Sequence, residues 1–198
     1  EEDVEQALRR MVEGMGVEAV AVSFLWSFLN PAHERLVADI AGRLYPDLPV
    51  SLSSEVFPAI REYERTNTTV IDAFISPGVR KYVGELEDYL QGNGFTGSLR
   101  MVHASGGVST PEEVRRAPVS LINSGPVAGY VGALKFGGII DRANIITADV
   151  GGTSFDTGII VDNTLHIDRQ VDLGLLHTGV NIVDVVSVGA GGGSIAWV

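Results

Sequence analysis

A chain of 198 residues with 45% hydrophobic and 20% charged side chains has enough apolar surface for a buried core, which excludes a disordered protein. The formal net charge of −11 disfavours nucleic acid as a partner, because phosphate contacts need Lys and Arg, but it permits a nucleotide bound by backbone N–H groups and a metal. The absence of Cys excludes disulfides and fits a reducing cytoplasm, and no apolar run approaches the roughly 18 residues of a transmembrane helix.

The first quarter of the chain alternates helix and strand signals. Apolar residues at helical spacing predict a helix over residues 3–14, and the apolar run 19–25 is typical of a strand buried on both faces of a parallel sheet. Asn30 is the expected N-cap of the next helix, with Pro31 at its first position. One face of that helix is apolar, and a second strand is expected at residues 49–52.

Two helices are expected in the middle of the chain. The spacing predicts one over residues 60–75 and another that starts at Ser76-Pro77 and ends at residues 92–94. A strand is expected over residues 99–103, followed by a sharp turn at 104–107.

A capping box begins the next segment. Thr110 has a hydroxyl that can accept from the amide of Glu113, and Glu113 can reach back to the Thr110 amide, so a helix is expected to start here. A short strand is predicted over residues 119–122. A helix over residues 125–136 follows, closed by Gly137-Gly138.

The last third of the chain is rich in strand signals. Residues 144–150 predict a buried, central strand. Residues 155–161 and 164–167 predict a hairpin, because Asp162-Asn163 between them tolerates positive φ. An apolar segment over 180–188 leads into a glycine-rich loop. Strands that alternate with helices, together with one antiparallel hairpin, predict an α/β fold with a mixed sheet and flanking helices.

The segment 149–156, Asp-Val-Gly-Gly-Thr-Ser-Phe-Asp, is the strongest candidate for chemistry. Gly151 and Gly152 can bring backbone amides against an anion because no Cβ intervenes, and the next two residues add hydroxyl donors. Asp149 and Asp156 would repel phosphate unless a Mg²⁺ stood between them. The alternative is a tight turn capped by aspartates, without a ligand. Two acids that bracket the turn favour the phosphate site.

A second glycine-rich loop follows at residues 189–194. It is a candidate nucleotide or substrate loop, and the alternative is a crossing of two backbones where side chains do not fit. Small residues also occupy one side of the helix after Pro126, which lets that helix lie close to a sheet or to a ligand. Its N-terminus, with Ser124 and Gly125, has the partial positive charge to face an anion.

Other polar groups give weaker signals. Glu62, Glu64 and Arg65 mix charges at helical spacing, which is typical of a solvated face, with a substrate or interdomain role as the alternative. His103 at the end of a strand is a candidate general base, although a lone histidine there is more often structural. The other histidines do not have the spacing of a metal site.

Five ordered segments of this sequence resemble the hydantoinase A/oxoprolinase family. They are residues 22–34, 62–69, 123–129, 149–156 and 189–196. The pattern Asp-x-Gly-Gly-Thr-x-x-Asp is similar to a phosphate loop of the superfamily that holds actin, sugar kinases and the heat-shock ATPases. The resemblance covers essentially the whole chain.

The resemblance implies part of an actin-like, ribonuclease H-like ATPase fold. Residues 1–57 would be the tail of the N-terminal hydantoinase A half, and residues 58–198 the start of the core with the second phosphate loop. The family's first phosphate loop, another Asp-x-Gly-Gly-Thr, is not in this sequence, which also lacks an initial Met. We therefore expect an internal fragment that holds part of an ATP site and has little or no activity alone.

The function that the resemblance implies is ATP-dependent opening of cyclic amides such as hydantoin or 5-oxoproline through phosphorylated intermediates. The alternatives are the ATP-using subunit of an acetone- or acetophenone-type carboxylase, and a nucleotide-switched actin-like module that is not an enzyme. ATP and Mg²⁺ are the expected cofactors, and a hydantoinase B-type subunit is a candidate partner. The expected metal ligands are Asp149 and Asp156. The expected nucleotide-binding residues are Asp149, Gly151, Gly152, Thr153, Ser154, Asp156, Gly191, Gly192 and Gly193.

Overall fold

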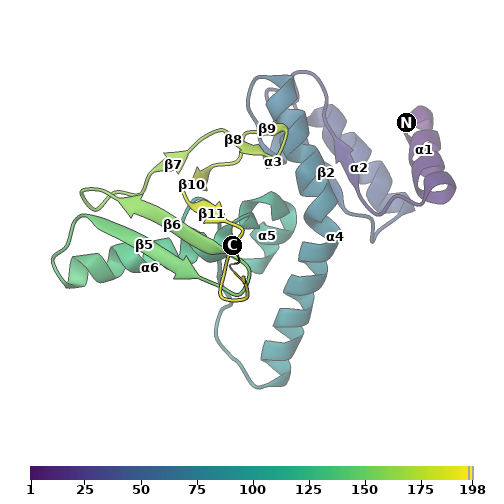
Figure 1. Ribbon diagram of the computed structural model, residues 1–198. Helices are drawn as coiled ribbons and strands as arrows, with labels where there is room; N and C mark the ends of the chain where they lie inside the picture. Colours follow the sequence, from purple (N-terminus) through teal and green to yellow (C-terminus); the bar gives the residue numbers. More distant parts are fainter. Residues whose placement is uncertain (196, 198) are drawn as a thin grey trace. The chain divides into compact units, whose positions relative to one another are not determined.

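The computed structural model describes residues 1–195 and 197, which form two compact units (Figure 1). The first unit comprises residues 1–101, 110–119 and 170–180, and the second comprises residues 102–109, 120–169 and 181–198. The chain therefore passes more than once between the units. No helix in the described part of the chain is both long and apolar enough to cross a bilayer.

The first unit opens with two helices and two strands that share one core. Helix α1 (Glu2–Arg9) continues as a short π-helix (Arg10–Gly14), and α2 (Ala32–Leu44) connects strands β1 (Val20–Val22) and β2 (Val50–Leu52). The strands pair in parallel, which requires a crossover such as α2. The predicted order of elements is confirmed, although each strand has only three residues. The buried core residues are Leu8, Val20, Val22, Val37, Ile40, Ala41 and Leu52.

Helix α2 begins one residue later than predicted. Pro31 occupies the N-cap position, and Ala32 is the first helical residue. Asn30 still serves this helix end, because its Oδ1 accepts a hydrogen bond of 3.2 Å from the Ala32 N–H. A single helical turn, α3 (Ser53–Val56), follows β2 directly.

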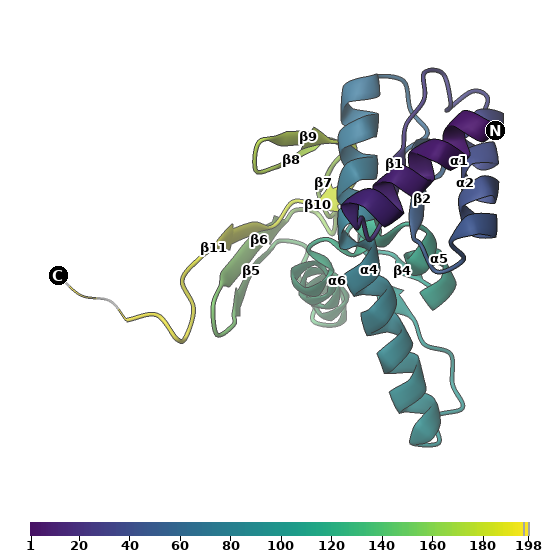
Figure 2. The ribbon, with the colours of Figure 1, turned by 90° about the vertical axis from the view of Figure 1, so that its right-hand side faces the viewer.

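The predicted break at Ser76-Pro77 is wrong. One helix, α4 (Glu62–Gly92), runs through both residues (Figure 2). A proline in a helix interior removes a backbone hydrogen bond and costs about 3 kcal/mol. However, Ala73 and Ser76 on one side of Pro77 and Val83 on the other side are all buried. Burial on both sides of the proline therefore keeps the helix continuous.

The end of α4 is as predicted, but the segment after it contains less strand than expected. Gly94, directly after the C-cap residue, has a φ of +79°. Strand β3 (Met101–Val102) pairs with β4 (Val108–Ser109) around a turn in which Gly106 has a φ of +85°. The sharp turn at 104–107 is therefore confirmed, while the strand before it has two residues.

The capping box of α5 (Pro111–Arg116) is confirmed. The Glu113 N–H donates to Thr110 Oγ1 over 3.2 Å, and the Thr110 N–H donates to Glu113 Oε2 over 2.7 Å. These two bonds satisfy donors that a helix N-terminus otherwise leaves free.

A 3₁₀ turn, η2 (Pro118–Leu121), replaces the strand predicted over residues 119–122. Pro118 has no N–H, and the Val119 N–H donates to Asp72 Oδ1 over 2.8 Å. Neither residue therefore offers an amide to a strand ladder. The strand prediction failed because the acceptor for Val119 is a side chain from α4, 47 positions away in the sequence.

An antiparallel sheet and one helix make up most of the second unit. The strand order is β11 (Val186–Val188), β6 (Phe155–Ile160) and β5 (Ile145–Val150), and α6 (Ser124–Ile139) packs against β5 and β6. Strand β5 is thus at the edge of this sheet, so the prediction of a central strand at 144–150 is wrong here. The α/β class is confirmed. The described residues place parallel pairing in β1–β2 and antiparallel pairing in this separate sheet, rather than in one mixed sheet.

The hairpin predicted across Asp162-Asn163 forms only at its turn. The two turn residues have φ of +49° and +57°, and a single bridge joins Val161 to Thr164. The chain then departs, and β7 (Ile167–Asp168) pairs with β10 (Ile182–Val183) instead. The ladder stops after one bridge because Ile167 and Asp168 pair with Val183 and Ile182 of β10 rather than with β6.

A second hairpin, which the sequence did not predict, belongs to the first unit. Strand β8 (Val171–Leu173) pairs with β9 (Leu176–Thr178), and the Gly179 N–H donates to Thr68 Oγ1 of α4 over 2.9 Å. Asn67 of α4 donates to the His177 carbonyl over 3.1 Å. Polar groups of the 62–69 motif thus hold this hairpin.

Helix α6 continues past Gly137-Gly138 to Ile139, so the predicted stop is wrong. Gly137 is in the helix because of close packing: a Cβ there would lie 2.2 Å from Ile145 Cδ1 and 2.8 Å from the Arg142 carbonyl oxygen. Its lack of a side chain lets the end of α6 approach the start of β5.

The sheet of β5, β6 and β11 has one open face. Alternate residues point toward α6, and the others point away from it. Ile146 on the open face is 77% exposed, so the strand predicted to be buried is covered on one side only. The exposed apolar residues on this face are Ile146, Val150, Ile159, Val186 and Val188.

Candidate functional site

The hairpin between β5 and β6 places Asp149 directly opposite Asp156. The Gly151 N–H donates to the Ser154 carbonyl over 2.9 Å and closes the turn. Residues 152 and 153 are therefore the tip of a tight hairpin, and the two aspartates stand on adjacent strands just behind it. Directly opposite residues of an antiparallel pair project from the same face, so their carboxylates are neighbours.

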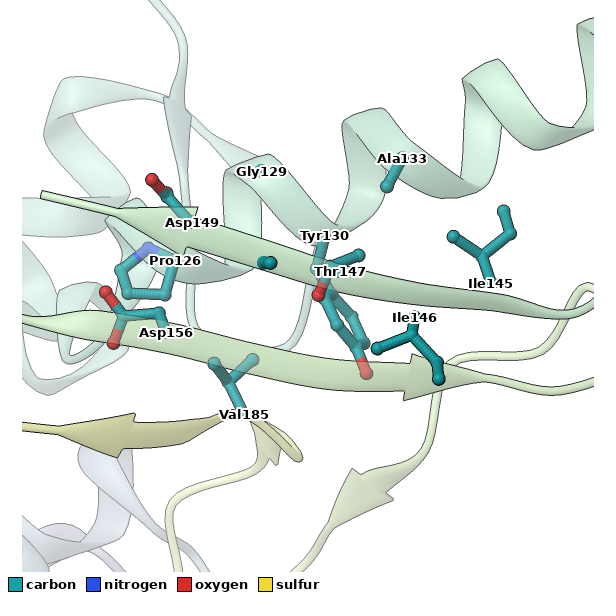
Figure 3. Close-up of a pocket in the computed structure, with 11 residues that line it drawn as sticks. Pro126, Gly129, Tyr130, Ala133, Ile145, Ile146, Thr147, Asp149, Asp156 and Val185 are labelled. Atoms are coloured by element: carbon teal, nitrogen blue, oxygen red, sulfur yellow. The ribbon is translucent and has the colours of Figure 1, made fainter.

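Both carboxylates lie on the face that packs against α6 (Figure 3). Gly129 of α6 lies close to this pair, because a Cβ there would be in ordinary van der Waals contact with Asp149 Oδ2, at 3.7 Å. A cavity of about 290 Å³ separates the helix from the strands, with the carboxylates at one end beside Pro126. The cavity is lined by Pro126, Gly129, Tyr130, Ala133, Ile145, Ile146, Thr147, Ala148, Asp149, Asp156 and Val185.

The two aspartates have different surroundings. Asp156 is 7% exposed and accepts hydrogen bonds from the hydroxyls of Ser154, over 3.1 Å, and of Ser187. Asp149 is exposed, and its carboxylate accepts no hydrogen bond from the residues that the structure describes. One carboxylate is thus held in place and the other is free to bind.

This pair of carboxylates suits a Mg²⁺ ion. Like charges directly opposite each other in a ladder destabilise it, and a cation between them removes that cost. Mg²⁺ in phosphate-binding sites is held by one or two carboxylates, with waters and phosphate oxygens as its other ligands. The described residues contain no group of three His, Asp or Glu side chains arranged for a metal. The remaining ligands would therefore come from water and from a bound phosphate.

The glycine-rich loop 189–194 contacts the hairpin tip. The Gly192 N–H donates to the Gly151 carbonyl and the Gly193 N–H to the Gly152 carbonyl, each over 2.9 Å. The structure thus brings the two glycine-rich segments together. Ala196, the last residue of the 189–196 motif, lies outside the described residues.

The small residues of α6 differ in their surroundings. Gly129 and Ala133 line the cavity, whereas a Cβ at Gly125 or Gly132 would meet nothing within 4 Å. Of these residues, Gly129 is the one that lies next to Asp149. The helix starts after Asn123, which has a φ of +57° and no side-chain cap bond.

Two residues of this region carried no signal in the sequence. Ser187 lies in β11 opposite Asp156, and only the strand register connects them. Tyr130 is buried, and its hydroxyl has no hydrogen-bond partner in the described part of the chain. Burial, with a smaller contribution from Asp184, raises the pKa of Tyr130. An unpartnered buried hydroxyl beside the cavity is a donor that a bound ligand or water can satisfy.

His103 is not among the residues that line the cavity. Its Nδ1 lies 2.7 Å from the Ser105 hydroxyl, and its backbone N–H donates to the Gly107 carbonyl over 3.0 Å. These contacts are local to the turn at 104–107. They favour the structural interpretation of His103 over the catalytic one.

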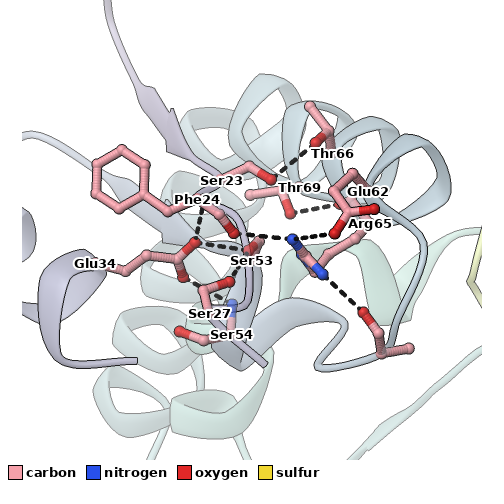
Figure 4. A network of polar contacts seen from close by, with 11 residues as sticks. Ser23, Phe24, Ser27, Glu34, Ser53, Ser54, Glu62, Arg65, Thr66 and Thr69 are labelled. Carbon is pink, nitrogen blue, oxygen red and sulfur yellow. Dashed lines mark hydrogen bonds and ion pairs between the residues drawn. The ribbon is translucent and has the colours of Figure 1, made fainter. Parts of the chain in front are cut away.

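In the first unit, Arg65 is fully buried, so its expected place on a solvated face is wrong (Figure 4). Its guanidinium donates to the Ala59 carbonyl over 2.9 Å and to the Phe24 carbonyl over 2.8 Å. It also lies 5.4 Å from the centre of the Phe28 ring. Its ion-pair partner is the half-exposed Glu62, whose Oε1 lies 3.8 Å from Arg65 Nη2. Arg65 therefore ties α4 to two loops by hydrogen bonds to carbonyls.

Glu34 is the second buried charge of this network. Its carboxylate accepts from the Phe24 N–H over 2.8 Å, the Ser53 hydroxyl over 2.7 Å and the Ser54 N–H over 2.9 Å. Burial by itself raises the pKa of Glu34, but the hydrogen bonds from Ser53, Phe24 and Ser54 together outweigh it and hold the pKa below its ordinary value. The segments 22–34 and 62–69 thus build one polar core.

Two protein-family models match this chain. The family model described as Hydantoinase/oxoprolinase matches residues 65–198, and the model described as Hydantoinase/oxoprolinase N-terminal region matches residues 1–45. The chain belongs to the hydantoinase/oxoprolinase family.

Named relatives and solved structures agree with this assignment. The chain is 38% identical over 207 aligned residues to the acetophenone carboxylase gamma subunit of Aromatoleum aromaticum, an alignment that covers 100% of this chain and 28% of the relative. It is 39% identical over 184 residues to caprolactamase subunit alpha of Pseudomonas jessenii, covering 91% of this chain and 26% of the relative.

The solved structures match over almost the whole chain. The crystal structure of ATP-dependent caprolactamase from Pseudomonas jessenii matches with a TM-score of 0.81 at 34% identity, covering 100% of this chain and 28% of that one. The nucleotide-free structure of acetone carboxylase also gives a TM-score of 0.81, at 29% identity, covering 96% of this chain and 27% of that one. The chain therefore spans little more than a quarter of the length of these proteins.

Proposed function

We propose that the full-length protein uses ATP to open a cyclic amide, and that the 149–156 hairpin is part of its nucleotide site. The observation that carries the proposal is the pairing of Asp149 with Asp156 behind a hairpin tip made of Gly152 and Thr153. One of the relatives is named as an ATP-dependent caprolactamase, which supports ATP-dependent opening of a cyclic amide as the reaction class.

Each part of the hairpin would have its own task. Asp149, with a free carboxylate, and Asp156, oriented by Ser154 and Ser187, would both bind Mg²⁺. Backbone N–H groups at the tip would face the phosphates. When bound, ATP would supply the phosphoryl group that turns a poorly reactive amide oxygen into a leaving group.

A carboxylase subunit is the second candidate. The acetophenone carboxylase gamma subunit aligns with the whole of this chain at 38% identity, which is close to the value for the caprolactamase subunit. The hairpin serves ATP in either reaction, so the site alone does not discriminate. A carboxylase would need bicarbonate together with a ketone before it consumed ATP, whereas an amide hydrolase would need only the amide.

We assign the full-length protein to the actin-like, ribonuclease H-like ATPases, with residues 1–57 and 58–198 in successive parts of that fold. Because relatives are named as subunits, a hydantoinase B-type partner is expected. Neither a nucleic acid nor a membrane is expected as a partner.

Phosphate release by the full-length protein, with and without its partner subunit, tests the function. The panel comprises hydantoin, 5-oxoproline, caprolactam, and acetone or acetophenone with bicarbonate. Amide-stimulated, Mg²⁺-dependent release supports the hydrolase. Release that requires ketone and bicarbonate together supports the carboxylase, and absence of ATP turnover with every substrate overturns both.

A further inference from the structure

The N–H groups of Gly191, Gly192 and Gly193, in the loop 189–194 that we call the brace loop, are already engaged. The Gly191 N–H donates to Ser194 Oγ over 3.0 Å. The Gly192 and Gly193 N–H groups donate to the carbonyls of Gly151 and Gly152, each over 2.9 Å. A ligand could use these three amides only by breaking existing hydrogen bonds. The brace loop therefore acts on the hairpin tip.

The two bonds to the hairpin fix the direction of its peptide groups. In a planar trans peptide the carbonyl of one residue and the N–H of the next point in opposite directions. Because the carbonyls of Gly151 and Gly152 both point at the brace loop, the N–H groups of Gly152 and Thr153 both point away from it. Neither N–H donates to any residue in the described part of the chain. Two successive free N–H groups on one side of a turn form a binding site for an anion.

Gly191 holds this arrangement by close backbone contact. A Cβ at residue 191 would lie 2.6 Å from the Gly151 carbonyl oxygen, 2.8 Å from Gly152 C and 2.8 Å from Thr153 N. All three are backbone atoms of the tip, so no flexible side chain can move aside. By contrast, a Cβ at Gly189 in the same loop would meet nothing within 4 Å.

We propose that Gly191 is a positioning residue for phosphate recognition: through the brace loop it keeps the N–H groups of Gly152 and Thr153 aimed at an oligophosphate group. This inference rests on the proposed function, because it assumes that the hairpin binds a nucleotide. It assigns phosphate contact to the two tip amides, and it gives Gly191, Gly192 and Gly193 the role of a brace. A bulkier residue 191 would push the tip away from the brace loop and turn its amides out of line.

Hydrogen exchange in the ligand-free, full-length protein tests the brace without any ligand. In protein labelled with [¹⁵N]glycine, we expect the Gly192 and Gly193 amides to be protected and the Gly152 amide to exchange rapidly. In Gly191→Ala, protection at Gly192 and Gly193 should fall, whereas Gly189→Ala should leave it unchanged. Unprotected Gly192 and Gly193 amides in the wild type would overturn the brace, whatever the protein binds.

Isothermal titration calorimetry tests whether the Gly152 and Thr153 N–H groups point at a bound phosphate group. Tripolyphosphate with Mg²⁺ and adenosine are titrated separately. Gly191→Ala should weaken tripolyphosphate binding by about tenfold or more, as for the loss of one hydrogen bond to a charged group. Adenosine binding should stay near the wild-type value even though the backbone clash lowers the melting temperature. Gly189→Ala should match the wild type in tripolyphosphate binding, adenosine binding and melting temperature.

Two results would overturn the inference while the proposed function stands. One is wild-type affinity for tripolyphosphate in Gly191→Ala. The other is an equal loss of tripolyphosphate and adenosine binding that follows a loss of stability, which would indicate a merely structural glycine. If the wild type shows a protected brace but binds neither ATP nor tripolyphosphate, the proposed function fails, and the phosphate role of Gly191 fails with it.

Discussion

The Ser187 hydroxyl donates a hydrogen bond to Asp156 Oδ1, although the two residues are 31 positions apart in the chain. The other carboxylate oxygen, Oδ2, accepts from Ser154 of the hairpin itself. Strand β11 thus contributes a side chain that holds one carboxylate of the site in a fixed orientation. The same strand leads directly into the brace loop, so β11 supports the hairpin through both a side chain and the backbone.

Removal of this hydroxyl should affect ATP turnover more than stability. We expect Ser187→Ala to lower kcat for ATP about tenfold, because outer-shell partners of metal ligands typically contribute 10- to 100-fold. The cost in stability should be about 1 kcal/mol, the value of one hydrogen bond. Thr157→Val is the control, since it removes the bond from Thr157 Oγ1 to the Thr147 carbonyl in the same sheet. Equal losses of kcat in the two variants would contradict this role for Ser187.

The two aspartates should matter for activity in a way that Asp162, an exposed aspartate in the turn after β6, does not. We expect Asp149→Asn and Asp156→Asn to lower ATP turnover about 100-fold or more, because charge compensation acts chiefly in the transition state. Without Mg²⁺, Asp149→Asn should be at least as stable as the wild type, since it removes one of two like charges directly opposite each other.

Asp162→Asn is the matched control for these variants. Asp162 lies in the turn after β6 with a φ of +49°, a conformation that Asn also adopts readily. Steady-state ATPase rates and thermal melting of all three variants decide the matter. If the three lose activity in proportion to stability, Asp149 and Asp156 are only turn residues.

Glu34 should make the protein more sensitive to acid. Its pKa in the folded state lies below the ordinary value of 4.5, so its contribution to stability is complete above that value and is lost as the pH falls through the folded pKa. Glu34→Gln should therefore be less stable than the wild type at pH 7, by about 1.5–3 kcal/mol for a hydrogen bond to a charged group.

The difference between Glu34→Gln and the wild type should shrink as the pH falls below 4.5. Urea unfolding across this range measures it, with Glu55→Gln as the control because Glu55 is exposed in the neighbouring helix α3. A difference that does not change with pH would show that ionisation of Glu34 adds nothing to stability.

Gly158 and Tyr130 should be strongly coupled. A Cβ at residue 158 would lie 2.0 Å from the Tyr130 hydroxyl oxygen and 2.1 Å from its ring. Gly158→Ala should therefore cost about 1–3 kcal/mol through overpacking. In a Tyr130→Ala background the same substitution should cost much less, and a double-mutant cycle by chemical unfolding measures the coupling. Additive effects would show that the ring does not fill the space above residue 158.

Local signals predicted the parts of the fold that a few neighbouring residues determine. The capping box at Thr110, the glycine at position 94 and the turn at Asp162-Asn163 all form as predicted, because each depends on φ preferences or on hydrogen bonds within four residues. The errors concern long-range packing. Helix α4 passes through Pro77, and the ladder after the Asp162-Asn163 turn stops, because distant segments supply the competing contacts.

For the candidate site, too, local sequence signals predicted correctly and long-range contacts were missed. The motif at 149–156 and the loop at 189–194 were recognisable from their glycines, and the structure places the two segments in contact. Ser187 was not recognisable, because only strand register brings it to Asp156. Arg65 was misjudged since its partners are the carbonyls of Phe24 and Ala59, which leave no trace in a charge pattern.

The open face of the β5–β6–β11 sheet has a practical consequence for work with these 198 residues alone. Its isoleucines and valines form an apolar surface next to β5, whose outer edge has no partner strand among the described residues. Exposed apolar faces and unpaired strand edges both promote association between copies of a chain. A sample of this polypeptide is therefore expected to sediment as concentration-dependent aggregates. Lysine at positions 159 and 186, which do not line the cavity, should restore monodispersity without touching the aspartates on the opposite face.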